Sequence, residues 1–241
     1  MLHAGDPNRT EPALSVRVAA KAHFSAAGTR LDVLRDLAFT LNKGETGALI
    51  GPSGCGKTSL MRLIAGIDRK FDGEIRLPAG ARLGMVFQEP RLLPWRSVED
   101  NVRLAAPAAT DGALDSLFAA LGLAAHRALF PGELSLGLAR RVAIARAFAV
   151  EPDLLLLDEP FVSLDEALAN KLRDELASLV AARHVTTLLV THDIEEALRL
   201  ANRIFLLSAR PAHIVQEIVV NASTDAAGLR RQIAQNLAAV S

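Results

Sequence analysis

The chain has 241 residues, half of them hydrophobic, and its 27 basic and 27 acidic side chains give a formal net charge of zero. A chain of this length builds one substantial hydrophobic core, so we expect a single domain. The balanced charge provides no long-range positive field for a phosphate backbone, which argues against nucleic acid as a partner.

Hydropathy and cysteine content indicate the cellular compartment in which the protein is expected. No apolar run approaches the roughly 20 residues that a membrane-spanning helix needs, and the first residues lack the basic and apolar regions of a leader peptide. We therefore expect a cytoplasmic protein, unless a partner holds it at a membrane. The single cysteine, Cys55, excludes an internal disulfide and fits a reducing compartment.

The first predicted elements are a tail and a set of strands. Residues 1–12 are polar and contain Pro7 and Pro12, which predicts a flexible N-terminal tail before a single domain over 13–241. Between residues 14 and 39 short stretches alternate apolar and polar side chains, as in Leu14-Ser15-Val16-Arg17-Val18. This pattern is typical of antiparallel strands with one face in water.

Three short apolar runs are each followed by helical spacing. The strands are predicted over 46–50, 154–157 and 186–190, and the helices that follow them over 58–66, 166–180 and 194–201. Strands without a wet face, alternating with helices, indicate a mainly parallel sheet that is covered on both sides.

Strand signals disappear between about residues 89 and 150, where helical spacing is found at 113–123 and 136–150. This predicts a helical subdomain over 89–150, inserted into an α/β core formed by 13–88 and 151–221. Residues 224–240 predict one amphipathic helix within a C-terminal segment, 222–241. The fold class expected is α/β, a mainly parallel sheet core with an antiparallel β subdomain and an inserted helical subdomain.

A glycine-rich phosphate loop joins the first predicted parallel strand to its helix. The pattern GxxxxGK[ST] is matched by Gly51, Pro52, Ser53, Gly54, Cys55, Gly56, Lys57 and Thr58, with Ser59 following. Glycines allow successive backbone N–H groups to surround a polyphosphate, and the helix start adds its positive dipole end. Lys57 is expected to reach the β- and γ-phosphates of ATP, and the Thr58 hydroxyl to bind Mg²⁺. The alternative is a glycine-rich turn with an incidental lysine.

An acidic pair follows the second parallel strand. Asp158 and Glu159 stand directly after four leucines, at the end of a strand where ligands of parallel sheets gather. Asp158 is expected to hold Mg²⁺, and Glu159 to act as the general base for the attacking water. The alternative is a solvated Asp-Glu turn at the end of a core strand.

The order of further motifs resembles the ABC ATPases over nearly the whole chain, from about Leu14 to Val219. The segments that carry the resemblance are Val86-Phe87-Gln88, Leu134-Ser135-Leu136-Gly137-Leu138, Ser163-Leu164-Asp165 and Thr191-His192-Asp193. The resemblance implies a P-loop ATPase of ABC type, in which Gln88 contacts Mg²⁺ and senses a membrane partner. It also implies a γ-phosphate hydrogen bond from His192, although a lone histidine is usually an ordinary satisfied one.

In this family two copies close head to tail, and the signature segment of each covers the nucleotide of the other. The resemblance therefore implies a homodimer, in which Ser135 and the backbone of Gly137 contact the nucleotide of the partner copy. Asp165 is expected to cap the next helix, to act across the dimer, or both.

The chain departs from the family pattern at two signature positions. Leu136 replaces the usual first glycine, and Leu138 replaces the usual glutamine. A leucine beside the phosphates hinders close backbone approach, so we expect weaker or slower closure. Because Lys57, Asp158, Glu159 and His192 are all present, an active ATPase is favoured over a cassette that binds ATP without turnover.

The family usually stacks adenine on an early tyrosine, and this chain has none. Phe24 is the nearest match, with His23 as a possible substitute. A plain core role for Phe24 is the alternative.

Residues 89–98, with Asp100-Asn101-Val102 after them, resemble a segment found in the importers of nitrate, sulfonates, taurine and related pyrimidine precursors. In these proteins an apolar surface here receives a helix of the membrane permease, and Leu92, Leu93 and Trp95 fit it, unless they close a local core. The resemblance implies an ATPase on the cytoplasmic face of the inner membrane, held there by a separate permease. A solute-binding protein delivers the solute to that permease. The rivals are a repair or translation ABC protein, a phosphate-loop kinase and a module that only binds ATP.

Overall fold

The computed structural model describes residues 11–25, 28–221 and 225–240. The predicted tail over 1–12 therefore lies outside the described residues except for Glu11 and Pro12, and the start of the segment 222–241 lies outside them as well.

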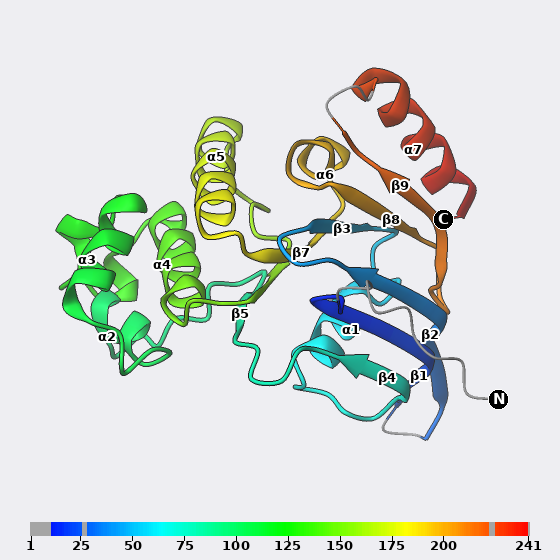
Figure 1. Ribbon diagram of the computed structural model, residues 1–241, viewed down its shortest axis with the longest axis horizontal. Helices are drawn as coiled ribbons and strands as arrows, with labels where there is room; N and C mark the ends of the chain where they lie inside the picture. The colour runs from blue at the N-terminus through cyan, green and yellow to red at the C-terminus, as the bar shows by residue number, and fades with distance from the viewer. Residues whose placement is uncertain (1–10, 26–27, 222–224, 241) are drawn as a thin grey trace.

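The centre of the molecule is a six-stranded sheet of order β5-β6-β7-β3-β8-β9 (Figure 1). Its first five strands are parallel to their neighbours and β9 is antiparallel to β8. The strands are β3 (Thr46–Ile50), β5 (Leu83–Val86), β6 (Leu154–Asp158), β7 (Thr186–Thr191), β8 (Arg203–Leu207) and β9 (Ile214–Val219). Pairing of Ile50 with Thr191, and of Asp158 with Val190, aligns the carboxyl ends of β3, β6 and β7 along one edge.

The central strands β3, β6 and β7 are buried throughout because both faces of the sheet are covered. Leu155 and Leu157 of β6 belong to one hydrophobic cluster, and Leu154 and Leu156 belong to the other. Successive side chains of a strand point to opposite faces, so a strand buried on both faces has no polar alternation. The fold class predicted from this pattern is confirmed.

Different elements cover the two faces. One face packs against α4 (Leu136–Ala149), α5 (Glu166–Arg183), α6 (Ile194–Leu200) and α7 (Ala226–Val240). The other packs against α1 (Lys57–Ile64) and a three-stranded antiparallel sheet of order β2-β1-β4. That sheet comprises β1 (Leu14–Phe24), β2 (Arg30–Leu41) and β4 (Asp72–Arg76). β4 had no sequence signal, since its DGEIR segment is largely exposed and does not alternate.

Short helices gather with α4 at one end of the molecule, away from the antiparallel sheet (Figure 1). They are α2 (Val98–Arg103) and α3 (Asp111–Ala120), followed by 3₁₀ turns at Ala124–His126 and Pro131–Glu133. The helix expected over 113–123 begins earlier, because Thr110 caps it by accepting a hydrogen bond from the Ala113 N–H. It also ends earlier, and the six-residue helix α2 was too short for the periodicity to predict.

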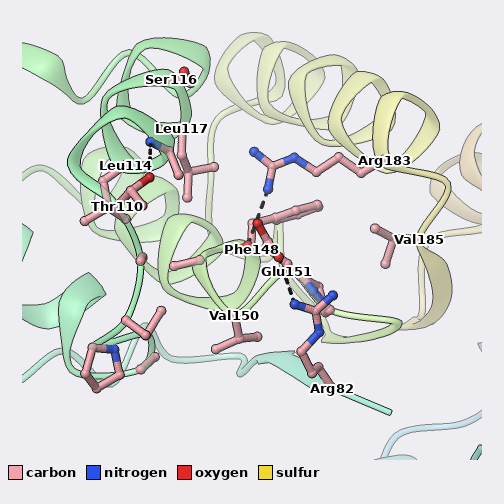
Figure 2. A pocket seen from close by; sticks show the side chains of 18 of the residues that line it. Arg82, Thr110, Leu114, Ser116, Leu117, Phe148, Val150, Glu151, Arg183 and Val185 are labelled. Carbon is pink, nitrogen blue, oxygen red and sulfur yellow. Dashed lines mark hydrogen bonds and ion pairs between the residues drawn. The ribbon is translucent and has the colours of Figure 1, made fainter. Parts of the chain in front are cut away.

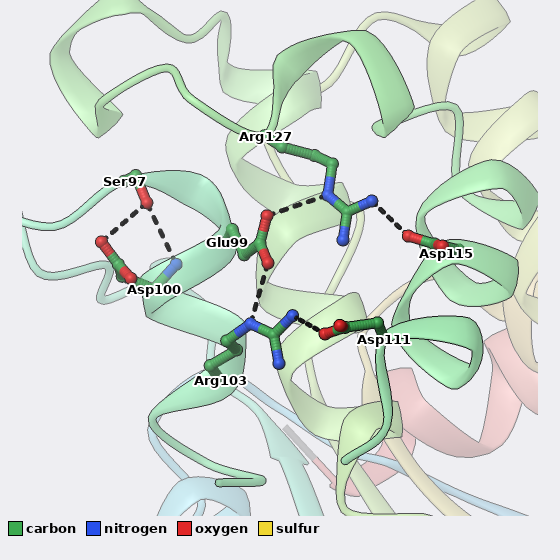
Figure 3. Close-up of polar contacts among 7 residues, drawn as sticks. All are labelled: Ser97, Glu99, Asp100, Arg103, Asp111, Asp115 and Arg127. Carbon is green, nitrogen blue, oxygen red and sulfur yellow. Dashed lines mark hydrogen bonds and ion pairs between the residues drawn. The ribbon is translucent and has the colours of Figure 1, made fainter.

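A polar network ties the short helices together (Figure 3). Glu99 of α2 accepts hydrogen bonds from Arg103 at 2.8 Å and from Arg127 at 3.0 Å. The same two arginines also pair with Asp111 and Asp115 of α3. Each guanidinium thus bridges two carboxylates, which fixes α2 and α3 relative to the loop that carries Arg127.

No helix in the described part of the chain is long and apolar enough to cross a membrane.

Candidate functional site

The phosphate loop, residues 51–58, runs from the end of β3 into α1, as predicted. Gly56 has φ of 126°, and a Cβ there would lie 2.7 Å from Val33 Cγ1, so only glycine fits. No described residue accepts a backbone hydrogen bond from the N–H groups of Gly54, Gly56, Lys57 or Thr58. Free N–H groups at a helix start form a setting that binds anions.

Lys57 is folded against this loop. Its Nζ donates hydrogen bonds to Gly51 O at 2.7 Å and to Pro52 O at 3.0 Å, and the residue is only 6% exposed. The two carbonyl groups hold a cation beside the free N–H groups, so positive charge gathers on the inner side of the loop.

Two side chains around the loop have roles that the motif did not specify. Cys55 is buried and packs in the core, and this burial raises the pKa of its thiol. Its N–H donates to Pro52 O at 3.2 Å, so both its backbone N–H and its side chain make contacts within the protein. Arg210, from the loop after β8, donates from Nε to Gly54 O. Sequence reasoning missed Arg210, because 156 residues separate the partners.

The predicted metal-binding residues converge at the carboxyl edge of the sheet. Thr58 Oγ1 lies 3.5 Å from Asp158 Oδ1, and both residues line a cavity of about 230 Å³ together with Gln88. Burial raises the pKa of the Asp158 carboxyl, and the hydrogen bond from Thr58 acts in the opposite direction. The hydroxyl, amide and carboxylate oxygens are the ligand types that Mg²⁺ prefers, and a cation here would favour the ionised form of the buried Asp158.

The described residues contain no cluster of three or more His, Cys, Asp or Glu side chains that could hold a metal ion. A cation at Thr58 and Asp158 therefore needs further oxygen ligands, such as phosphate groups of a bound nucleotide.

Glu159 and His192 face each other across neighbouring strands. Glu159 Oε2 lies 3.4 Å from His192 Nδ1, and both residues line a cavity of about 280 Å³. Glu159 has φ of 45°, a left-handed conformation that is uncommon for a residue other than glycine. Such strained positions cluster at functional sites. The imidazole is more than half exposed, directly after the end of β7.

A second buried carboxyl, which sequence reasoning missed, lines the same cavity. Glu196 of α6 is 4% exposed, and its Oε2 accepts a hydrogen bond from Thr191 Oγ1 at 2.6 Å. Burial raises its pKa to about 7, although the Thr191 hydrogen bond and the charge of Arg173 oppose the rise. Its position on an amphipathic helix gave no sign of this burial.

His23, and not Phe24, lies against the helix that follows the phosphate loop. His23 Nε2 is 3.1 Å from Ser59 Oγ, whereas Phe24 is 69% exposed at the end of β1. Neighbouring side chains of a strand point to opposite faces, which directs Phe24 away from Ser59. The core alternative for Phe24 is wrong, because the ring is largely in solvent.

The signature tip, residues 135–137, is the start of α4, where Ser135 and Leu136 are exposed and Gly137 is buried. Ser135 caps the helix by accepting a hydrogen bond from the Leu138 N–H at 3.3 Å, and Leu136 is 43% exposed. A Cβ at Gly137 would lie 2.6 Å from Leu168 Cδ2 of α5, so this glycine permits close helix packing. Leu138 packs on the core, which leaves Leu136 as the departure that faces outward.

Asp165 caps α5, because its Oδ1 accepts a hydrogen bond from the Leu168 N–H at 2.9 Å. This bond confirms the capping alternative for Asp165.

The apolar segment after Gln88 divides between core and surface. Leu92 packs against the core, whereas Trp95 is 71% exposed. Asn101 is fully buried, and its Nδ2 donates to the carbonyl groups of Leu93, Arg96 and Ser97. The loop is thus held firmly while its tryptophan faces solvent.

A cavity of about 800 Å³ lies elsewhere, between α3, the end of α4 and the start of β6 (Figure 2). Its wall includes Phe148, Arg183 and Arg82, and the charge of Arg82 is offset by Glu151 at 2.8 Å. It adjoins the amino end of β6, whereas the phosphate loop follows the carboxyl end of β3. It is therefore separate from the candidate site.

Known proteins match this chain over most of its length. Residues 34–162 match the family model described as ABC transporter. The aliphatic sulfonates import ATP-binding protein SsuB 2 of Burkholderia cenocepacia is 41% identical over 218 residues, which cover 87% of this chain and 79% of that protein. SsuB of Bacillus licheniformis is also 41% identical over 218 residues, covering 86% of this chain and 85% of the relative.

A solved structure extends the likeness to the fold. The dimeric, post-hydrolysis ATP-binding cassette MJ0796, bound to ADP and Pi, superimposes with a TM-score of 0.74 at 26% identity. The match covers 87% of this chain and 99% of that one. With a phosphate loop, an acidic pair and a signature tip in the same fold, the chain belongs to the ABC transporter family and is an ABC-type ATPase.

Proposed function

We propose that this protein is the ATP-hydrolysing subunit of an ABC importer that takes up small anionic solutes of the sulfonate, taurine or nitrate kind through a separate permease. The observation that carries the proposal is the convergence of Lys57, Thr58, Asp158 and Glu159 at one edge of the sheet. The solute class is supported by the relatives, which are named as import proteins for aliphatic sulfonates.

ATP is the substrate that the phosphate loop suits. Its β- and γ-phosphates accept hydrogen bonds from the free N–H groups of Gly54, Gly56, Lys57 and Thr58. Lys57 then exchanges the carbonyl groups of Gly51 and Pro52 for phosphate oxygens. Pro52, Ser53 and Cys55 shape the loop, and Ser59 supports it from α1.

Thr58, Asp158 and Gln88 hold Mg²⁺ in this proposal, since all three line one cavity. The ion supplies charge neutralisation for the phosphates.

Glu159 is the general base in this proposal. It accepts a proton from the attacking water, a role worth on the order of a hundred- to ten-thousandfold in rate. His192, at 3.4 Å, orients the carboxylate and donates a hydrogen bond to the γ-phosphate. The strained backbone at Glu159 aims the carboxylate at one position.

His23 is the better platform for adenine than Phe24, the residue first predicted. It lies 3.1 Å from Ser59, beside the start of α1, and its ring presents a flat surface for stacking.

Two copies form the working unit in this proposal. The tip residues Ser135 and Gly137 of one copy cover the nucleotide of the other, and Asp165 adds a contact across the dimer. The dimeric cassette MJ0796 supports this arrangement. Exposure of Leu136 at the tip leaves an apolar side chain between the copies.

The permease docks on the rigid loop that presents Trp95. A large aromatic side chain 71% exposed on a firmly held loop is typical of a protein interface. This contact places the subunit peripherally on the cytoplasmic face of the inner membrane, where a solute-binding protein acts from the other side.

The test is steady ATP hydrolysis by the purified protein, compared with Lys57→Ala. Release of phosphate should fall at least a hundredfold in Lys57→Ala, because the negative charge of the transferred γ-phosphoryl group is no longer stabilised by the lysine ammonium. Lys43→Ala, an exposed lysine outside the loop, should keep the activity. No hydrolysis by the unaltered protein, even with its membrane partners, would instead indicate a cassette that only binds ATP.

A further inference from the structure

Helix α4 places a buried arginine between two segments of the proposed site. Arg140 is 3% exposed, and its Nη1 donates a hydrogen bond to Phe87 O at 3.2 Å. Its Nη2 donates to Val162 O at 3.3 Å. Phe87 immediately precedes Gln88, and Val162 precedes the loop from Ser163 to Asp165.

This guanidinium is costly to bury. Desolvation lowers the pKa of Arg140, and no described residue hydrogen-bonds its Nε, which is also buried. An apolar side chain would fill the same space without that cost. Two hydrogen bonds to carbonyl groups offset this cost, and they join the segment after β5 to the loop after β6.

A second arginine of the same helix holds the far side of the Gln88 segment, residues 87–91. Arg146 donates hydrogen bonds to Pro90 O and Arg91 O, both at 2.8 Å. Arginines of α4 are therefore hydrogen-bonded to this segment on both sides of Gln88. Of the two arginines, Arg140 also reaches the segment that follows Glu159.

We propose that Arg140 is a positioning residue that makes the signature tip, Gln88 and the loop after Glu159 move as one unit. The inference rests on the proposed function and deepens it. Because Ser135 begins the helix that carries Arg140, docking of the tip on a partner copy is transmitted through the guanidinium to both segments. Small misplacements of such segments are costly, since an error of about 1 Å can reduce a rate about a hundredfold.

The experiment compares Arg140→Lys and Arg140→Met with Arg141→Gln in the full chain. Both Arg140 variants should lower kcat about tenfold or more. The Kd for a fluorescent ATP analogue should stay within about twofold, because the phosphate loop is unchanged. ATP-driven dimerisation, measured by gel filtration with Glu159→Gln present, should weaken in parallel.

Arg141 is the matched control. It is buried on the same helix and donates to a carbonyl, Leu121 O at 2.8 Å, but it touches neither segment. It also pairs with Glu175 at 3.0 Å, so its loss should lower Tm while kcat stays within about twofold.

Wild-type kcat and dimerisation in Arg140→Lys, with only a lower Tm, would overturn the inference and leave Arg140 a structural residue. Arg140→Lys decides the matter even where Arg140→Met fails to fold. Absence of both hydrolysis and dimerisation in the parent chain would overturn the proposed function, and the inference with it.

Discussion

The two halves of the proposed nucleotide site are built differently within one chain. In the phosphate-loop half, Lys57 is hydrogen-bonded to its own loop, Thr58 lies 3.5 Å from Asp158, and Glu159 lies 3.4 Å from His192. In the signature half, the Ser135 hydroxyl caps α4, and Leu136 is 43% exposed.

The first half of the proposed site is assembled when the chain folds, whereas the second half is completed only when two copies associate. The sheet brings the proposed catalytic groups together, because the carboxyl ends of parallel strands share one edge. In the proposed site the signature tip contacts the nucleotide of a second copy, so it contributes only when that copy binds. Variants of the first half should therefore affect chemistry, and variants of the second half should affect dimer closure.

The largest effect is expected from Glu159→Gln in the first half. Without the carboxylate base, hydrolysis should fall on the order of a hundred- to ten-thousandfold, while ATP still binds. The variant should accumulate as an ATP-bound dimer, visible by gel filtration. Glu195→Gln, an exposed site on α6, should behave as the parent. Monomers alone at saturating ATP would argue against the shared site.

The next effect concerns the buried carboxyl beneath the first half. The pKa of Glu196 is about 7 in the folded chain and ordinarily about 4.5, so folding holds a proton that unfolding releases. Stability from this group is complete below about pH 4.5 and is lost as pH rises through about 7.

Glu196→Gln keeps a neutral side chain at every pH, so its stability should gain on the parent by on the order of 3 kcal/mol between pH 4.5 and 8. Urea unfolding at several pH values measures this. Parallel curves for the two proteins would mean that Glu196 is ionised in the folded state.

A smaller effect, on ATP-driven dimerisation, is expected from Ser135→Asp at the signature tip. Ser135→Asp keeps the helix cap, since aspartate accepts the same hydrogen bond from Leu138. It also faces a carboxylate toward the phosphates of the partner, so ATP-driven dimerisation should weaken more than about tenfold with Tm unchanged. Equal dimerisation by Ser135→Asp and the parent would remove Ser135 from the interface.

The smallest expected effect is a gain. Leu136→Ala removes the exposed side chain and preserves helix propensity, so closer approach of the copies should raise turnover about two- to fivefold, roughly 0.5–1 kcal/mol. ATP hydrolysis measured against protein concentration tests this. A fall in turnover would show that Leu136 contributes a favourable contact between copies.

Local patterns in the sequence were sufficient to predict the phosphate loop, the acidic pair and the three central strands. In each case a local backbone feature and a reactive side chain lie next to each other in the sequence. Gly56 stands beside Lys57, and Asp158 ends β6. Periodicity was weaker at the ends of the helices, where capping decides, as at Thr110 of α3. It was uninformative for β4, which is mostly exposed.

Tertiary structure alone decided how distant residues meet. It placed His23 and not Phe24 beside Ser59, Arg210 on the phosphate loop, and Arg140 between Phe87 and Val162. Residue type and spacing along a strand or helix follow from the sequence directly, because the backbone repeat determines which side chains share a face. Contacts between elements depend on how helices pack on the sheet, so no local repeat encodes them.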